Sequence, residues 1–124
     1  MKTIQGNWIC VSAVIDGKSL PEETTRQLRL TISEKRYKTE KSGEVLFDST
    51  YSLNSSSNPM QIDLLGTEGN LAGKHGEGIY SVDGDILRIC YTMPGQRRPK
   101  EFESPVNSKV YLVIWKRDQS FPES

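Results

Sequence analysis

The chain has 124 residues, which is enough for one compact domain and too few for two. Its 16 Lys and Arg residues balance 16 Asp and Glu residues, so it lacks the positive surface that binding to nucleic acid requires. No apolar run reaches the length of about 20 residues that spans a bilayer, and the N-terminus has no apolar core of a signal peptide. We therefore expect a cytoplasmic protein with one domain over residues 1–124 and no membrane span.

The first predicted element is a strand over residues 8–15. Apolar side chains occupy both its even and its odd positions, whereas a half-buried strand alternates. A β-bulge within this strand would exchange its inward and outward faces and so account for the pattern. Residues 16–17 (Asp-Gly) predict a turn. Residues 20–23 (Leu-Pro-Glu-Glu) predict one short helical turn, because proline and acidic residues favour a helix N-terminus.

Alternation of apolar and polar residues recurs along the rest of the chain and is typical of strands. Five glycines between Gly66 and Gly78 predict a flexible loop, which we expect to be the most mobile segment. A proline-rich connection over residues 94–105 leads to the last strand. Seven further strands are predicted, over residues 28–32, 36–40, 45–53, 60–64, 79–82, 87–93 and 110–115.

This succession predicts an all-β fold, an antiparallel barrel of about eight strands with one short helical turn. Closure into a barrel leaves no exposed strand edge. It also requires the first and last strands to meet, which would bring Trp8 against Arg117. A guanidinium over an indole ring gains cation–π attraction and covers apolar surface, so we expect this contact at the barrel floor.

The ends of the chain resemble the lipocalin pattern, in which a Gly-x-Trp tryptophan closes the barrel floor and a basic side chain near the C-terminus covers its ring. Four segments in order resemble a lipocalin-like domain family that is abundant in Planctomycetes. They are residues 6–23 (GNWICVSAVIDGKSLPEE), 78–91 (GIYSVDGDILRICY), 97–104 (RRPKEFES) and 111–117 (YLVIWKR). The resemblance implies a lipocalin-like barrel and no particular activity. Ile9, Cys10 and Val14 depart from the family pattern, and the apolar surface they add predicts a subunit contact.

Motifs for catalysis, metals or cofactors are not found in the sequence. His75 is the only histidine, which rules out a histidine-rich metal site, and we expect it to be solvated in the glycine-rich loop. Asp83 and Asp85 flank Gly84 as a hairpin turn requires, and the turn explains them better than paired catalytic carboxylates do. The glycines lack phosphate-loop spacing. We therefore predict that the protein is not an enzyme and holds neither metal nor cofactor.

The two cysteines, Cys10 and Cys90, lack the spacing of a redox or zinc motif. We expect both to be buried, reduced thiols. An alternative is that Arg88, two residues from Cys90, lowers the thiol pKa and makes it a nucleophile, although no base partner is evident.

Arg97, Arg98 and Lys100 form a basic cluster before the last strand. We expect this cluster to be solvated and neutralised by Glu101 and Glu103. The alternative is that it lies at a barrel mouth and holds an anionic headgroup, which Arg binds well through charge-assisted hydrogen bonds.

Our functional prediction is non-enzymatic binding of a small apolar or amphipathic anionic ligand inside the barrel. The alternative is a filled barrel that binds another protein or a second copy through the apolar surface of Ile9, Val11 and Ile15. The candidate ligand-binding residues are Tyr51, Tyr80, Tyr91, Arg97 and Arg98. Other candidates for a cavity wall are Phe47, Leu87 and Ile89.

Overall fold

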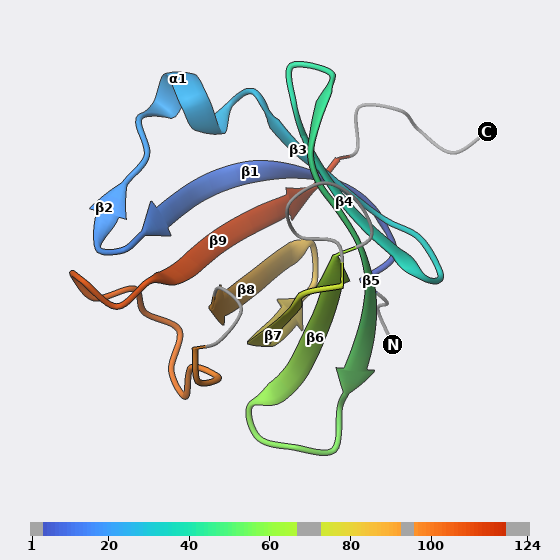
Figure 1. Ribbon diagram of the computed structural model, residues 1–124. Helices are drawn as coiled ribbons and strands as arrows, with labels where there is room; N and C mark the ends of the chain where they lie inside the picture. Colours follow the sequence, from blue (N-terminus) through green and yellow to red (C-terminus); the bar gives the residue numbers. More distant parts are fainter. Residues whose placement is uncertain (1–3, 67–72, 93–95, 119–124) are drawn as a thin grey trace.

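Nine antiparallel strands and one short helix make up the described part of the chain (Figure 1). The computed structural model describes residues 4–66, 73–92 and 96–118. Within these residues no helix is both long enough and apolar enough to cross a membrane. Helix α1 spans Glu22–Thr25. The strands are β1 (Gly6–Ile15), β2 (Lys18–Ser19), β3 (Leu28–Ile32), β4 (Arg36–Lys41), β5 (Glu44–Asn54), β6 (Met60–Gly66), β7 (His75–Asp83), β8 (Ile86–Thr92) and β9 (Val110–Arg117).

Strand pairing closes the sheet into a barrel. From β3 to β9 each strand pairs with the next, and β1 pairs with β3 on one side and β9 on the other. The short strand β2 is an addition that folds back on the end of β1. The predicted eight-stranded antiparallel barrel with one helical turn is therefore confirmed.

Strand β1 carries the bulge that its sequence pattern predicted. Its pairing with β9 is regular up to Cys10 and resumes at Ser12, with a register shift between the two residues. Before the shift Trp8 and Cys10 belong to the buried core, and after it Ala13 does. The bulge thus exchanges the inward positions, and it leaves Val11 53% exposed.

Trp8 closes one end of the barrel beneath Arg117. The two residues are partners on β1 and β9, and the guanidinium carbon lies 4.3 Å from the indole centroid. Trp8 is fully buried, and its Nε1 donates to the carbonyl of Ile4 at 2.9 Å. Arg117 also donates to the carbonyl of Gln5 at 3.0 Å and pairs with Asp85, with 3.4 Å between Nε and Oδ1. The predicted contact is confirmed.

Large side chains pack above this floor in one continuous core cluster. Trp115 is the next inward residue on β9, and it lies between Cys10 on β1 and Leu87 on β8. Trp115 is 2% exposed. Fully buried aliphatic residues of the same cluster are Leu30, Ile62, Leu87 and Ile89.

The glycine-rich segment differs from its prediction. Strand β7 begins at His75, so the last part of the expected loop 66–78 is a strand, and residues 67–72 lie outside the described residues. A Cβ atom on Gly78 would lie 2.7 Å from the carbonyl oxygen of Cys90 on β8. The glycine therefore serves a close approach of two strands rather than loop flexibility.

We predict that Arg117→Ala lowers the free energy of unfolding by about 1–2 kcal/mol, because it uncovers the Trp8 ring and removes the partner of Asp85. Urea unfolding followed by tryptophan fluorescence measures the change. Lys116→Ala is the control, since Lys116 is the exposed neighbour on the same strand. Equal stability of the two variants would contradict the assigned role.

Candidate functional site

The connection between β8 and β9, described from residue 96 to 109, is anchored to the outside of the barrel, and we call it the strap. Phe102 provides its apolar anchor and lies under Arg88, whose guanidinium carbon is 5.2 Å from the ring centroid. At the C-terminal end of the strap, the Ser104 hydroxyl donates to the carbonyl of Val110 at 2.6 Å and accepts from the N–H of Gly17 at 3.1 Å. Phe102 and Leu112 pack against a small second core of Ile79, Cys90 and Val110.

Arg98 ties the strap to β6 and β7. Its guanidinium donates to Asp63 at 2.7 Å and to Glu77 at 3.2 Å, and these two carboxylates are partners across the two strands. It also donates to the backbone carbonyls of Ile62 at 3.3 Å and Gly78 at 2.9 Å. With two carboxylates and two carbonyls as partners, the charge of Arg98 is compensated within the protein.

The rest of the basic cluster has no such arrangement. Arg97 and Lys100 are exposed, as predicted. The expectation that Glu101 and Glu103 neutralise the cluster is wrong for Arg98, whose acidic partners come from β6 and β7. A side-chain hydrogen bond that protonated Glu103 donates to Glu101, together with the negative charge of Glu101, instead raises the pKa of Glu103.

The three candidate tyrosines lie on β5, β7 and β8 and pack against the barrel core. The hydroxyl of Tyr51 donates to the carbonyl of Ser33 at 2.7 Å. The ring of Tyr91 stacks on Tyr111, with 5.1 Å between centroids. Burial raises the pKa of Tyr80 and Tyr91, so both hydroxyls stay neutral. The structure thus brings the tyrosines to the interior and leaves the Arg98 guanidinium with the outward-facing carboxylates of β6 and β7.

Both cysteines are free and buried, as predicted. Burial raises the pKa of each thiol from 9.0 to about 11. Arg88 donates to Ser81 at 3.1 Å, and burial remains the largest influence on the pKa of Cys90. The low pKa on which a nucleophilic Cys90 depended is therefore not found.

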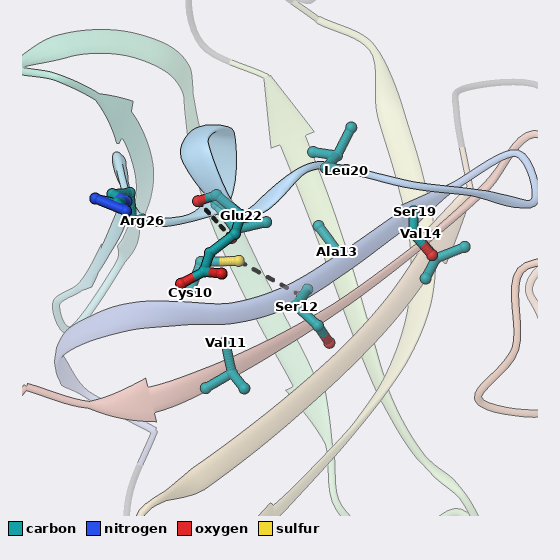
Figure 2. A pocket seen from close by; sticks show the side chains of 10 residues that line it. Cys10, Val11, Ser12, Ala13, Val14, Ser19, Leu20, Glu22 and Arg26 are labelled. Atoms are coloured by element: carbon teal, nitrogen blue, oxygen red, sulfur yellow. Dashed lines mark hydrogen bonds between the residues drawn. The ribbon is translucent and has the colours of Figure 1, made fainter.

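An open cleft of about 380 Å³ lies in the barrel wall between β1 and α1 (Figure 2). Strand β1 pairs with β3 only as far as Ile9 and with β2 from Val14 onward. Between these points no described strand pairs with this edge of β1, and the chain entering α1 covers it. One backbone hydrogen bond, from Leu20 N–H to the carbonyl of Ala13 at 2.9 Å, joins the two segments here.

The cleft has an apolar base and a polar rim. Cys10 and Ala13 are core residues, and Leu20 packs against the same core. Figure 2 shows the side chain of Glu22 directed toward β1 and that of Arg26 directed away from it. Glu22 and Arg26 form no ion pair with each other. The full lining is Cys10, Val11, Ser12, Ala13, Val14, Ser19, Leu20, Glu22, Thr25 and Arg26.

The remaining polar candidates have structural surroundings. His75 is the first residue of β7 rather than part of a loop, and its Nε2 lies 3.7 Å from Asp63 Oδ1. Gly84 occupies the hairpin turn with a φ of 61°, as the turn prediction requires. Among the residues that the structure describes, no three His, Cys, Asp or Glu side chains gather in a way that could hold a metal ion.

Comparison with protein-family models, curated proteins and solved structures finds no match to this chain. Membership of the lipocalin-like domain family therefore stays a prediction, and function has to be argued from the geometry of the site.

The sequence did not predict the cleft. Its two components were visible separately, as the bulge in β1 and the helical turn at residues 20–23. Nothing in the sequence indicated that the pairing of β1 with β3 ends at Ile9. Because the pairing ends there, space is left for the cleft between β1 and α1.

We predict that Arg98→Ala lowers the free energy of unfolding by about 1–3 kcal/mol, because it leaves two adjacent carboxylates and two carbonyls without their donor. Arg97→Ala is the matched control and should change stability by less than about 0.5 kcal/mol. Urea unfolding measures both. The Cys90 thiol lies against the strap, within hydrogen-bonding distance of the carbonyls of Glu101 and Glu103. Loss of Arg98 should loosen the strap and expose this thiol, so we expect faster alkylation of Cys90 in Arg98→Ala and not in Arg97→Ala.

We predict that the cysteines make the protein less stable in alkali. The thiols ionise near pH 9 in the unfolded chain and near pH 11 in the folded protein, so the unfolded state loses protons first. Their contribution to stability is therefore complete below pH 9 and is lost as the pH rises toward 11. Urea midpoints across this range measure it, and the decline should be smaller in Cys90→Ala than in the wild type. An equal decline would contradict the raised pKa of Cys90.

Proposed function

We propose that this protein is a non-enzymatic binder of one small amphipathic molecule, which occupies the cleft between β1 and α1. The observation that carries the proposal is a cleft of about 380 Å³ that has core residues at its base and polar side chains at its rim. Small-molecule sites are typically concave spaces of about 300–1,000 Å³ that combine an apolar wall with a few polar groups.

The burial of the cleft base in the barrel core supports this proposal. Cys10 and Ala13 are 7% and 3% exposed. Both belong to β1, which pairs with β9 along its other edge. A preformed base reduces the entropy that binding would cost. The ligand's apolar part would contact Cys10, Ala13 and Leu20, whereas Trp8 occupies the barrel floor and Trp115 packs above it.

The position of Arg98 argues against the headgroup site expected on the strap. Its guanidinium already has two carboxylate partners, so an anion there would compete with Asp63 and Glu77. Arg97 alone would remain, and it is exposed. Arg97 also does not line the cleft, so it is not placed to hold the polar end of a ligand bound there.

The alternative function is a filled barrel that acts as an interaction module. Val11 favours it, because this apolar side chain on the outer edge of the bulge is 53% exposed. Since Val11 also lines the cleft, a test of the proposal must separate the two functions.

We predict that the uncharged dye Nile red binds the wild-type protein and that Ser19→Trp weakens this binding by about tenfold or more, because the indole would fill part of the cleft. Lys18→Trp is the control, since Lys18 is the exposed neighbour on β2 and does not line the cleft. Dye fluorescence measures affinity. Equal binding by all three proteins would place the dye elsewhere, and no binding by the wild type would favour the interaction module.

A further inference from the structure

We propose that the cleft prefers a ligand whose polar end is an ammonium group, which Glu22 holds, over a ligand that ends in a carboxylate. The inference rests on the proposed function and adds the charge of the ligand to it. It departs from the anionic ligand that the sequence predicted.

The direction of the charged side chains is the first argument. Figure 2 shows the Glu22 side chain reaching from α1 toward β1, while Arg26, one helical turn later, is directed away from β1. A Glu and an Arg at this spacing commonly pair. Here the two form no ion pair, so the carboxylate of Glu22 remains available to a cation in the cleft.

Hydrogen-bonding capacity at the rim is the second argument. The hydroxyls of Ser12 and Ser19, which line the cleft, can each accept a hydrogen bond from a ligand. An ammonium group brings three donors and no acceptor, which suits a rim with a carboxylate and hydroxyls.

The apolar base is the third argument, because it determines which chemical group the uncharged part of the ligand should have. An alkyl or similar apolar body would cover Leu20, Ala13 and the Cys10 thiol, which burial keeps protonated and uncharged near neutral pH. A small amine with an apolar body therefore matches the base and the rim together.

The test compares three ligands with the same chain and different ends: n-octylamine, octanoate and n-octanol. Each is titrated below its micelle concentration, and two readouts are used. One is displacement of Nile red, and the other is protection of Cys10 from N-ethylmaleimide in a Cys90→Ala background, which leaves one thiol. Since Cys10 lines the cleft, an occupant should slow its alkylation.

We expect octylamine to bind about threefold to fivefold more tightly than octanoate, because Glu22 is exposed and solvent screens its charge. Glu22→Gln should abolish this preference and leave octanol binding unchanged. Glu23→Gln should keep it, because Glu23 is the neighbouring exposed carboxylate of α1 and does not line the cleft.

The outcomes separate the two proposals. Equal or tighter binding of octanoate, or a preference for octylamine that survives Glu22→Gln, overturns the ammonium assignment while the cleft remains a binding site. If none of the three ligands displaces the dye or protects Cys10, the proposed function itself fails.

Discussion

The pairing of β1 with β9 is the interaction on which the rest of the structure depends. It runs from Trp8 opposite Arg117 to Ile15 opposite Tyr111 and converts a sheet of successive hairpins into a closed barrel. Closure is also what places Arg117 over the indole ring. Trp8 on the first strand and Arg117 on the last thus act together: the indole fills the end of the barrel, and the guanidinium covers the indole ring.

The cleft follows from the same pairing. Strand β1 pairs with β9 from Trp8 to Ile15, but it pairs with β3 only from Gly6 to Ile9. The bulge after Cys10 changes the inward positions from even to odd numbers. The barrel wall is therefore incomplete beside the bulge, where α1 and β2 take the place of a strand. A bulge next to a binding site is a recurrent arrangement, because the extra residue changes the direction of a strand without ending it.

Local patterns predicted much of the fold, and distant contacts remained hidden. Apolar residues on both faces of β1 indicated the bulge, and alternation indicated the strands. In contrast, the acidic partners of Arg98 lie on β6 and β7, far from it in sequence, so its neighbours Glu101 and Glu103 were the wrong expectation. The start of β7 at His75 was missed because glycines signal loops in sequence, whereas Gly78 serves the contact between two strands.

In the proposed function, the position of the cleft separates recognition from stability. Its base belongs to the core cluster, whereas Glu22 is the first residue of α1, Arg26 directly follows this helix, and both side chains are exposed. Changes at these two positions would alter the charge that a ligand meets without opening a cavity in the barrel. The strap, by comparison, is tied to β6 and β7 by the partly buried side chain of Arg98. A cation that already has two carboxylate partners stabilises the fold, whereas Glu22, at the rim of the cleft, is the carboxylate that we propose takes part in recognition.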